Sequence, residues 1–406
     1  MPTCAGWRVS NDRGARRIAL VHEWLTEWGG SEDALRHILA CYPQAEDFAT
    51  IDFLSDADRK KLGARSIRTT WLQRAPGVRQ KFWNYLPVTP LAVETHDAGA
   101  ADVIVSSSHA FAKGVLTHAN QLHLSYVYSP MRYAWDLHHE YLRDYRLERG
   151  AKGLLARYMF HRLRAWDRQT ANNVDLFVAI SRHVQQRIWR CYRRPAAVIY
   201  PPVATHRFAL ETSKQDHYVT VSRLVSYKRV DMMLKAFAAM PSRKLVVIGS
   251  GPEEERLRAA CPPNVTLLGF QPHEVVQQHL ASARAFIFAA HEDFGISPVE
   301  AQACGTPVIA YGRGGACETV RDFRSAERAT GLLYPEQTPD SLRAAVEAFD
   351  DAVIDPHDCR AWAETFDEAH FRSRFTALVD RAWEAWSRDP ATVEALLEAG
   401  GAPSVH

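Results

Sequence analysis

Residues 292–310 read Glu-Asp-Phe-Gly-Ile-Ser-Pro-Val-Glu-Ala-Gln-Ala-Cys-Gly-Thr-Pro-Val-Ile-Ala, with carboxylates at Glu292 and Glu300. The apolar run 285–290 precedes this stretch and predicts a buried strand with Glu292 in the loop at its carboxyl end. A helix is expected to open near 297–298, because proline is tolerated in the first helical turn. The two carboxylates should therefore lie side by side where a strand ends and a helix begins.

The loop between this strand and helix has the features of a ligand site. In an open parallel sheet, ligands bind at the carboxyl ends of the strands. The backbone N–H groups of Phe294, Gly295 and Ile296 would point toward an anion there, as N–H groups at helix starts do. Two carboxylates beside an anion site suit a ligand with a phosphate end and a polyhydroxyl end, and a nucleotide sugar is such a ligand.

Composition and charge limit the classes of protein that this chain can be. Its 406 residues are 47% hydrophobic, which predicts two or three domains with proper cores. The net charge of +2 gives no field that would attract nucleic acid. Seven scattered cysteines without paired spacing argue against a disulfide framework or a zinc site and favour a reducing cytoplasm. The polar start of the chain does not resemble a secretory signal, and no apolar run is long enough to span a membrane.

Short apolar runs alternate with amphipathic stretches along the whole chain, which predicts βαβ units with parallel sheets and hence an α/β fold. The expected strands of the first half are Ile18–His22, Phe48–Phe53, Val103–Ser106, Leu122–Tyr128, Leu176–Ile180 and Val198–Tyr200. Those of the second half are Tyr218–Val221, Leu245–Ile248, Val265–Leu268, Ala285–Phe288 and Val308–Ala310.

Two adjacent prolines, Pro201 and Pro202, divide these two series, because neither fits a central strand or a helix interior. We therefore expect two Rossmann-like lobes with their ligands in a cleft between them. The expected segments are a flexible start at 1–16, an N-terminal lobe at 17–200, a hinge at 201–206, a C-terminal lobe at 207–370, a helix at 371–388 that returns to the first lobe, and a loose tail at 389–406.

Two cations, Arg223 and Lys228, follow the expected strand 218–221 and precede a helical stretch. Arginine grips phosphate oxygens bidentately, whereas lysine acts as a point charge, so the pair is suited to a diphosphate. The alternative for this pattern is a solvated basic helix start.

Two glycines, Gly29 and Gly30, follow the first expected strand and would allow the backbone to approach a phosphate closely. An ordinary turn capped by Ser31 is the alternative. The sequence Gly-Ser-Gly-Pro at 249–252 resembles a dinucleotide fingerprint but lacks its third glycine, which disfavours a dehydrogenase.

Further candidates lie in loops of the first lobe. His109 follows a buried strand, and the loop 129–136 carries Arg132, Tyr133 and Trp135, whose donors and ring faces suit a sugar. The alternative is that Tyr133 and Trp135 fill the core. A basic stretch, 143–168, interleaves arginines with apolar residues, as helices on anionic lipid do, although a solvated helix packed on the lobe would look the same.

Three features together resemble the donor-site motifs of retaining glycosyltransferase family 4, which has the GT-B fold. They are the spacing of Glu292 and Glu300, the pair Arg223 and Lys228, and the glycine pair at 29–30. The resemblance extends from Ile18 to about Trp386. The sequence Ser-Pro-Met-Arg-Tyr-Ala-Trp at 129–135 is similar to a subgroup of mannosyltransferases that build bacterial surface polysaccharides from GDP-mannose.

The resemblance implies that the N-terminal lobe, 17–200, binds the acceptor and that the C-terminal lobe, 207–370, binds the nucleotide sugar. It also implies roles for the motif residues. Arg223 and Lys228 would hold the diphosphate, and Gly30 would let the opposite lobe approach it. The ribose would be bound by Glu300, and donor-sugar hydroxyls by Glu292. The remaining implied contacts are His109 beside the reacting carbon, Gly269 and Phe270 bordering the base, and Arg132, Tyr133 and Trp135 at the acceptor.

The resemblance further implies that no cofactor or metal is needed beyond the nucleotide-sugar donor. The acceptor would be a glycan or a lipid-linked oligosaccharide, and the enzyme would work in the cytoplasm, peripherally on the inner leaflet of the membrane. Two other readings stay open: a nucleotide-sugar epimerase with the same two lobes, and a non-catalytic nucleotide or glycan sensor.

Overall fold

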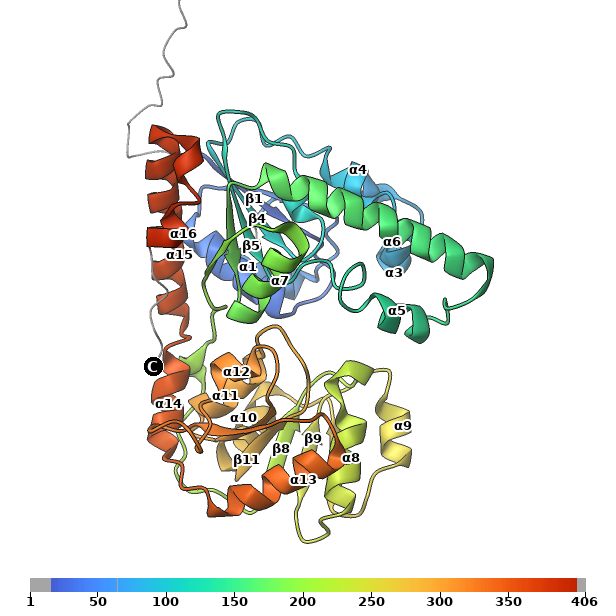
Figure 1. Cartoon of the computed structure of the whole chain (residues 1–406), viewed down its shortest axis with the longest axis vertical. Helices are drawn as coiled ribbons and strands as arrows, with labels where there is room; N and C mark the ends of the chain where they lie inside the picture. Colours follow the sequence, from blue (N-terminus) through green and yellow to red (C-terminus); the bar gives the residue numbers. More distant parts are fainter. Residues whose placement is uncertain (1–15, 64, 400–406) are drawn as a thin grey trace, which may run out of the picture. The chain divides into compact units, whose positions relative to one another are not determined.

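The computed structural model describes residues 16–63 and 65–399, and it divides into two compact units (Figure 1). The first unit contains residues up to Ile180, then 184–199 and 372 onward. The second contains 181–183 and 200–371. The boundary along the chain thus falls between Ile199 and Tyr200, and 201–206 group with the second unit. Their role as a hinge stays a prediction. Of the expected flexible start, 1–16, residues 1–15 lie outside the described residues.

The first unit has a seven-stranded parallel sheet in the order β3-β2-β1-β4-β5-β6-β7. Its strands are β1 Ile18–His22, β2 Glu46–Ala49, β3 Ile67–Thr69, β4 Val103–Ser108, β5 Leu122–Val127, β6 Leu176–Ala179 and β7 Ala196–Val198. All residues of β1, β4, β5 and β6 are buried, as expected for strands of a parallel sheet that is covered on both faces.

Most helices of the first unit lie between its strands along the chain. Their bounds are α1 Gly30–Cys41, α2 Asp56–Lys61, α3 Val78–Lys81, α4 Thr89–Val93, α5 His138–Asp144, α6 Gly150–Thr170, α7 Arg182–Tyr192, α15 Glu368–Arg388 and α16 Leu396–Ala399. In α1, four apolar residues spaced along one face are buried: Ala34, Leu35, Ile38 and Leu39. From Arg372 on, α15 groups with this unit, where Phe375 contacts the rings of Tyr42 and Tyr126.

The second unit has a six-stranded parallel sheet in the order β10-β9-β8-β11-β12-β13. Its strands are β8 Tyr218–Val221, β9 Leu245–Ile248, β10 Val265–Gly269, β11 Ala285–Phe288, β12 Val308–Tyr311 and β13 Gly331–Tyr334. Its helices are α8 Val230–Ala238, α9 Glu254–Ala259, α10 His273–Ser282, α11 Ile296–Ala303, α12 Ala316–Thr319, α13 Pro339–Ala348 and α14 Pro356–Glu364.

Both sheets reverse the direction of strand addition at one point, between β1 and β4 in the first unit and between β8 and β11 in the second. Such a switch point opens a crevice at the carboxyl ends of the two strands and is the usual ligand position in this architecture. The predicted α/β fold with two Rossmann-like units is therefore confirmed, and each unit has one place where a ligand is expected.

Several boundary predictions are wrong in detail. The strand predicted at Phe48–Phe53 is Glu46–Ala49, because the buried residues that follow form a loop, whose Ile51 carbonyl accepts from the N–H of Leu25. The last strand of the first unit is Ala196–Val198 rather than Val198–Tyr200. The expected loose tail is ordered over 389–399, where Val393 is buried and Glu394 forms an ion pair with Arg194. Residues 400–406 lie outside the described residues.

Candidate functional site

The switch point of the second sheet brings three predicted residues to one edge. Arg223 and Lys228 follow β8, and Glu292 follows β11, which pairs with β8 in parallel. The Lys228 ammonium forms an ion pair with the Glu292 carboxylate, and both side chains are about five-sixths buried. Residues 64 positions apart in the sequence thus meet, because neighbouring parallel strands end at the same edge.

Arg223 is exposed at this edge, and its guanidinium makes no hydrogen bond or ion pair with any of the residues that the structure describes. The backbone around it is fixed by the turn after β9. A Cβ on Gly249, whose φ is +136°, would lie 1.9 Å from the carbonyl oxygen of Ser222, and one on Gly251 would lie 2.4 Å from that of Leu224. The glycines at 249 and 251 therefore serve close backbone packing beneath Arg223, not a dinucleotide.

The loop that carries Glu292 is held in the same way by the second glycine-rich turn. The N–H of Gly315 donates to the carbonyl of Glu292 at 2.8 Å. A Cβ on Gly314 would come within 2.3 Å of that same carbonyl oxygen, and one on Gly315 within 2.3 Å of the Cα of Phe294. Only residues without a side chain allow this approach, so the turn 312–315 sets the path of the loop.

The start of α11 offers unpaired donors. Gly295 precedes the helix with φ +86°, a conformation that favours glycine. Within 16–63 and 65–399, no acceptor is found for the backbone N–H groups of Phe294, Gly295 and Ile296. The Phe294 ring itself is buried against Tyr200 and Phe366, which anchors the loop. These backbone groups are therefore available to an anion at the helix start, and the anion site itself stays a prediction.

Glu300 lies on α11 and is half-buried. Gly269 ends β10 with φ +71°, and the next residue, Phe270, is 80% exposed. An aromatic ring so exposed next to a sheet edge is available to stack on a planar ligand group. The structure therefore places Gly269 and Phe270 at the carboxyl edge of the same sheet as Arg223, Lys228 and Glu292.

In the first unit, Gly29 and Gly30 begin α1 after β1, and both are exposed. The turn is tied to the sheet by buried polar groups. Glu32 lies 3.5 Å from His22 and accepts from the Ser31 hydroxyl at 2.9 Å. Burial alone would raise the pKa of Glu32, but the hydrogen bond and charge of His22 bring the pKa below its ordinary value. The turn that bears the two glycines is thus fixed by a buried carboxylate.

His109 follows β4, and its ring packs edge-on against Trp24 with 4.5 Å between the ring centroids. Burial lowers the pKa of His109, and the charge of Glu23 partly opposes this. Glu23 is a residue that the sequence analysis did not identify. Its fully buried carboxylate accepts hydrogen bonds from the backbone of 109–112. The one available signal was its place directly after a predicted strand.

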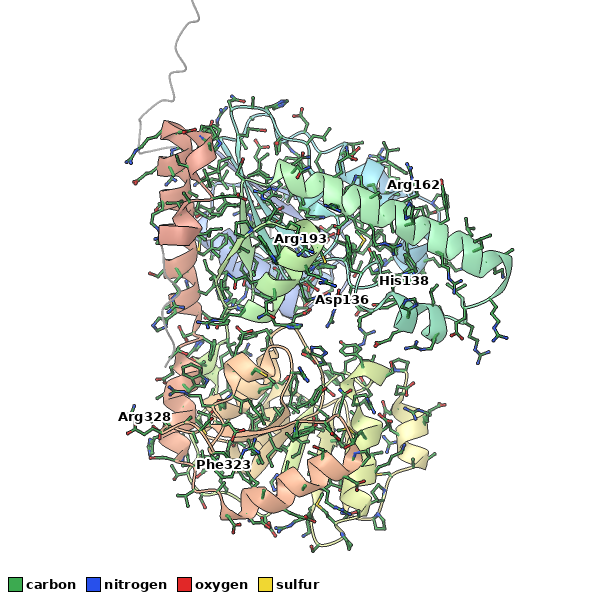
Figure 2. The ribbon with its side chains drawn as sticks, in the orientation of Figure 1. Asp136, His138, Arg162, Arg193, Phe323 and Arg328 are labelled. Atoms are coloured by element: carbon green, nitrogen blue, oxygen red, sulfur yellow. The ribbon has the colours of Figure 1, made fainter. Side chains whose placement is uncertain are left out.

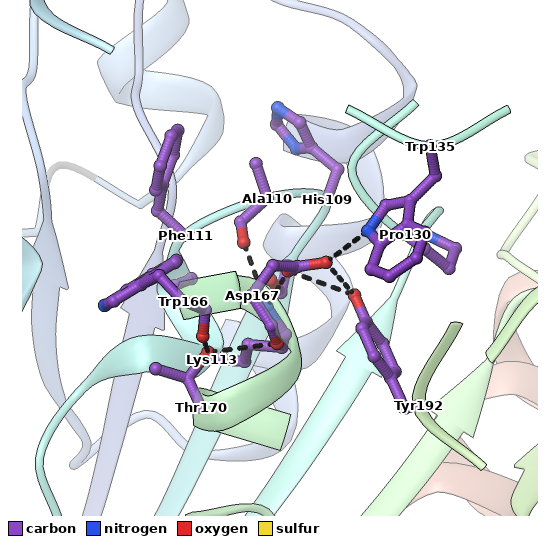
Figure 3. Close-up of polar contacts among 12 residues, drawn as sticks. His109, Ala110, Phe111, Lys113, Pro130, Trp135, Trp166, Asp167, Thr170 and Tyr192 are labelled. Carbon is purple, nitrogen blue, oxygen red and sulfur yellow. Dashed lines mark hydrogen bonds and ion pairs between the residues drawn. The ribbon is translucent and has the colours of Figure 1, made fainter. Parts of the chain in front are cut away.

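The loop 129–136 carries the residues predicted to contact the acceptor. Tyr133 is 7% exposed and packs in the core with Tyr141 and Phe160, which matches the alternative that its ring fills the core. Its contact with the acceptor stays a prediction. The indole N–H of Trp135 donates to the buried carboxylate of Asp167 at 2.7 Å, although part of the ring is exposed (Figure 3). Arg132 is half-buried, and its role at the acceptor stays a prediction.

Residues 16–63 and 65–399 contain no group of three or more His, Cys, Asp or Glu side chains arranged to hold a metal ion. None of the helices described there is both long and apolar enough to cross a membrane.

Chemically, the edge of the second sheet combines an exposed guanidinium, an ammonium, two carboxylates, a set of unpaired N–H groups and an exposed aromatic ring. Charge-assisted hydrogen bonds of the kind that Arg223 and Lys228 could donate are each worth about 1.5 to 3 kcal/mol. Carboxylates accept from hydroxyl groups, and the ring can stack on a base. The set matches a ligand with anionic, polyhydroxyl and planar parts.

Comparisons with known proteins agree with this description. The family model of glycosyl transferases group 1 matches residues 203–365, which lie within the second unit. A GDP-mannose-dependent monoacylated alpha-(1-6)-phosphatidylinositol monomannoside mannosyltransferase of Corynebacterium glutamicum is 37% identical over 148 residues, 32% of this chain and 37% of that protein. A GDP-mannose-dependent alpha-(1-6)-phosphatidylinositol monomannoside mannosyltransferase of Mycolicibacterium smegmatis is 28% identical over 251 residues, 52% of this chain and 63% of that protein. The chain thus covers less than two thirds of either relative.

Solved structures share the fold at low sequence identity. HepE of Anabaena, crystallised with UDP and glucose, has a TM-score of 0.65 at 17% identity and covers 90% of this chain and 100% of its own. Sucrose-phosphate synthase from Thermosynechococcus elongatus has a TM-score of 0.65 at 18% identity, with 91% and 100% covered. The resemblance predicted from the motifs is therefore confirmed: the chain has the GT-B fold, and its second unit carries the sequence pattern of the group 1 glycosyltransferases.

Proposed function

We propose that this chain is a retaining glycosyltransferase that moves a hexosyl group, mannose from GDP-mannose, onto a hydroxyl of a glycan or lipid-linked oligosaccharide in polysaccharide biosynthesis. The observation that carries the proposal is the ion pair of Lys228 with Glu292 beside the exposed Arg223 at the switch point of the second sheet. Support for the donor comes from two relatives that are named GDP-mannose-dependent.

In the proposed reaction, the bond between the anomeric carbon and the β-phosphate oxygen breaks, and the nucleoside diphosphate departs with both electrons. Arg223 and Lys228 stabilise the charge that develops on the diphosphate. Glu292 accepts hydrogen bonds from donor-sugar hydroxyls, and the N–H groups of Phe294, Gly295 and Ile296 orient the donor. Positioning of this kind can lower the barrier by about 7 to 11 kcal/mol.

The acceptor hydroxyl attacks the same face of the sugar, and its proton passes to the departing phosphate oxygen, so that the anomeric configuration is retained. Glu300 would bind the ribose and Phe270 would stack on the base. His109 would lie beside the anomeric carbon. These steps use only side chains and backbone groups of this chain, and we propose that no metal ion takes part.

A reaction assay tests the proposal. Purified protein is incubated with GDP-mannose and a lipid-linked oligosaccharide acceptor, with and without EDTA, and the products are identified by NMR and mass spectrometry. The proposal predicts an α-linked mannosyl product and GDP at equal rates in both conditions. A stereoisomer of the nucleotide sugar, formed without any acceptor, would instead show an epimerase, and saturable binding without turnover on any acceptor would show a sensor.

We also propose that the first unit contacts the inner leaflet of the membrane through the N-terminal half of α6. Leu154, Leu155 and Tyr158 are 72%, 58% and 60% exposed there. Exposed basic residues lie on the same helix, among them Lys152 and Arg162, the latter labelled on α6 in Figure 2. Apolar side chains framed by basic groups suit an anionic lipid surface, at about 1 kcal/mol for each basic residue near it.

Co-sedimentation with liposomes of phosphatidylglycerol and phosphatidylcholine tests this surface. The native protein should pellet with the anionic vesicles, and the double variant Leu154→Glu, Leu155→Glu should remain in the supernatant. Val353→Glu, at a position 98% exposed in the second unit, is the matched control and should pellet like the native protein. Equal pelleting of the double variant and the native protein would overturn the proposed contact.

A further inference from the structure

A buried carboxylate holds the segment that carries His109. Glu23 directly follows β1 and has no solvent exposure, and β1 pairs with β4, the strand that ends in this segment. Its Oε1 atom accepts a hydrogen bond from the Ser108 hydroxyl at 2.9 Å. The same oxygen lies within hydrogen-bonding distance of four consecutive backbone N–H groups, those of His109 at 2.9 Å, Ala110 at 2.7 Å, Phe111 at 2.8 Å and Ala112 at 3.0 Å.

Convergence of so many donors on one group constrains the backbone strongly. Four successive N–H groups can point at one atom only if the chain curls around it, and this curl fixes the direction in which the Cα–Cβ bond of residue 109 leaves the backbone. Burial by itself would raise the pKa of Glu23, but the charge of His109 and the backbone N–H groups bring it below its ordinary value, so the carboxylate is charged. A charged carboxylate accepts such hydrogen bonds more strongly than a neutral group does.

The far end of the segment has a second anchor (Figure 3). Lys113 is buried and forms an ion pair with Asp167 of α6, which also accepts from the Tyr192 hydroxyl at 3.0 Å and from the Trp135 indole. The Lys113 ammonium donates to the carbonyl of Ala110 at 3.2 Å. Glu23 therefore acts on the N–H groups of the segment, and the Lys113–Asp167 pair ties its end to the neighbouring helix.

We propose that Glu23 is a positioning residue that orients His109 at the switch point of the first sheet. This inference rests on the proposed function, because it is in that reaction that His109 would lie beside the reacting carbon. The titratable groups that face the His109 ring are Glu23 and His22, at the end of β1, and Glu32 on α1. The Tyr128 ring, after β5, lies 6.4 Å from it between centroids.

The first measurement needs no substrate. Protein with 13C-labelled histidine is titrated by NMR, and the Cε1 signal of His109 is assigned with the variant His109→Gln. Glu23→Gln removes a negative charge next to the ring, so the pKa of His109 should fall relative to the native protein. Lys113→Met loosens the other anchor without removing that charge and should leave the His109 titration closer to the native one. An unchanged pKa in Glu23→Gln would overturn the proposal.

The second measurement is steady-state kinetics. A misplacement of about 1 Å in a reacting group can cost about a hundredfold in rate, so Glu23→Gln should lower kcat by about that factor while KM for the donor stays near the native value. Glu23→Asp keeps the charge and should retain more of kcat than Glu23→Gln. A rise in donor KM with native kcat would contradict a positioning role.

The two measurements separate failure of this inference from failure of the proposed function. If no transferase activity is found but the His109 titration shifts as predicted, the proposed function is wrong and the structural role of Glu23 stands. If activity is found and neither kcat nor the titration responds to the variants, the inference is wrong. Circular dichroism shows whether each variant is folded. If Glu23→Gln does not fold, Glu23→Asp replaces it in the titration. The pKa of His109 should then also shift, because the shorter side chain moves the carboxylate away from the ring.

Discussion

Lys228 and Glu292 form an ion pair at the carboxyl edge of the second sheet, although they come from different motifs of the sequence. The sequence predicts that they contact different parts of one ligand, the diphosphate and the donor sugar. They meet because the strands that precede them, β8 and β11, are neighbours. In the proposed function, these two subsites therefore adjoin. A donor would bind with its anomeric carbon close to this pair.

Replacement of the cations tests the diphosphate site. Arg223→Ala removes an exposed guanidinium, so the fold should persist while kcat/KM falls. Loss of one charge-assisted hydrogen bond, about 1.5 to 3 kcal/mol, corresponds to about ten- to hundredfold. Arg343→Ala, at a similarly exposed position on α13, is the matched control and should keep native kcat/KM. Near-native rates for Arg223→Ala would refute the assignment.

Lys228→Ala has a second consequence, because it leaves the largely buried Glu292 carboxylate without its cation. We expect kcat/KM to fall by a factor similar to that for Arg223→Ala, and the melting temperature to fall slightly. The double variant Lys228→Ala, Glu292→Gln removes both charges and should recover the melting temperature but not the activity, since loss of one partner of a buried pair costs more than loss of both. Recovery of activity in the double variant would mean that neither group contacts the substrate.

Phe270 provides a test of base recognition. Its exposed ring is expected to stack on the base, and such stacking is worth about 1 to 3 kcal/mol. Phe270→Ala should therefore raise the Kd for the nucleoside diphosphate by about five- to hundredfold in calorimetry. Phe270→Tyr keeps an aromatic face and should bind nearly as the native protein does. If the alanine variant binds with the native Kd, the base lies elsewhere.

Gly249→Ala tests how the packing beneath Arg223 supports the site. The new Cβ would meet the carbonyl oxygen of Ser222, so the backbone that carries Arg223 must move. We expect weaker nucleotide binding together with a loss of stability. Gly77→Ala is the control for backbone strain alone. Gly77 also has a positive φ, but a Cβ there would meet no atom within 4 Å. Equal effects of both variants on nucleotide binding would contradict the packing argument.

Stability should depend on pH through His123. This fully buried imidazole lies 2.9 Å from both the Ser106 hydroxyl and the carbonyl oxygen of Asn173, and burial lowers its pKa from 6.5 to about 4. In the unfolded chain the ring takes up a proton below pH 6.5, while the folded protein keeps it neutral. The free energy of unfolding should therefore fall between pH 6.5 and 4, with His123 contributing up to about 3 kcal/mol.

Denaturant unfolding across this pH range measures the effect. His123→Asn keeps a donor for the Asn173 carbonyl but cannot titrate, so its stability should depend less steeply on pH than that of the native protein. His357→Asn, at an exposed position, should leave the native slope unchanged. An identical slope for His123→Asn and the native protein would show that His123 is already charged in the folded state.

Much of the fold could be predicted from the sequence, because buried parallel strands are continuous apolar runs. The bounds of β1, β8, β9 and β11 were predicted as observed. The edge strands β3 and β13 were missed. In β3 the central residue is an exposed arginine, Arg68, so no apolar run marks the strand, and β13 begins with a glycine.

The site was predictable to the extent that its residues lie next to each other in the sequence or directly after a strand. Arg223, Lys228 and Glu292 lie at the predicted sheet edge for this reason. Glu23 was missed because its partners, the Ser108 hydroxyl and the backbone N–H groups that follow it, are 85 to 89 positions away. The burial of Tyr133 could not be predicted, because an aromatic residue in a loop looks the same in the sequence whether its ring is covered or exposed.

The central claim is that the carboxyl edge of the second sheet binds a nucleoside diphosphate. Isothermal titration of the native protein with GDP, UDP, ADP and dTDP, repeated with Arg223→Ala, tests it most directly. The account predicts saturable binding of one of these, GDP in our proposal, and a Kd about tenfold or more higher in the variant. Absence of binding for all four, or equal affinity in the variant, would contradict it.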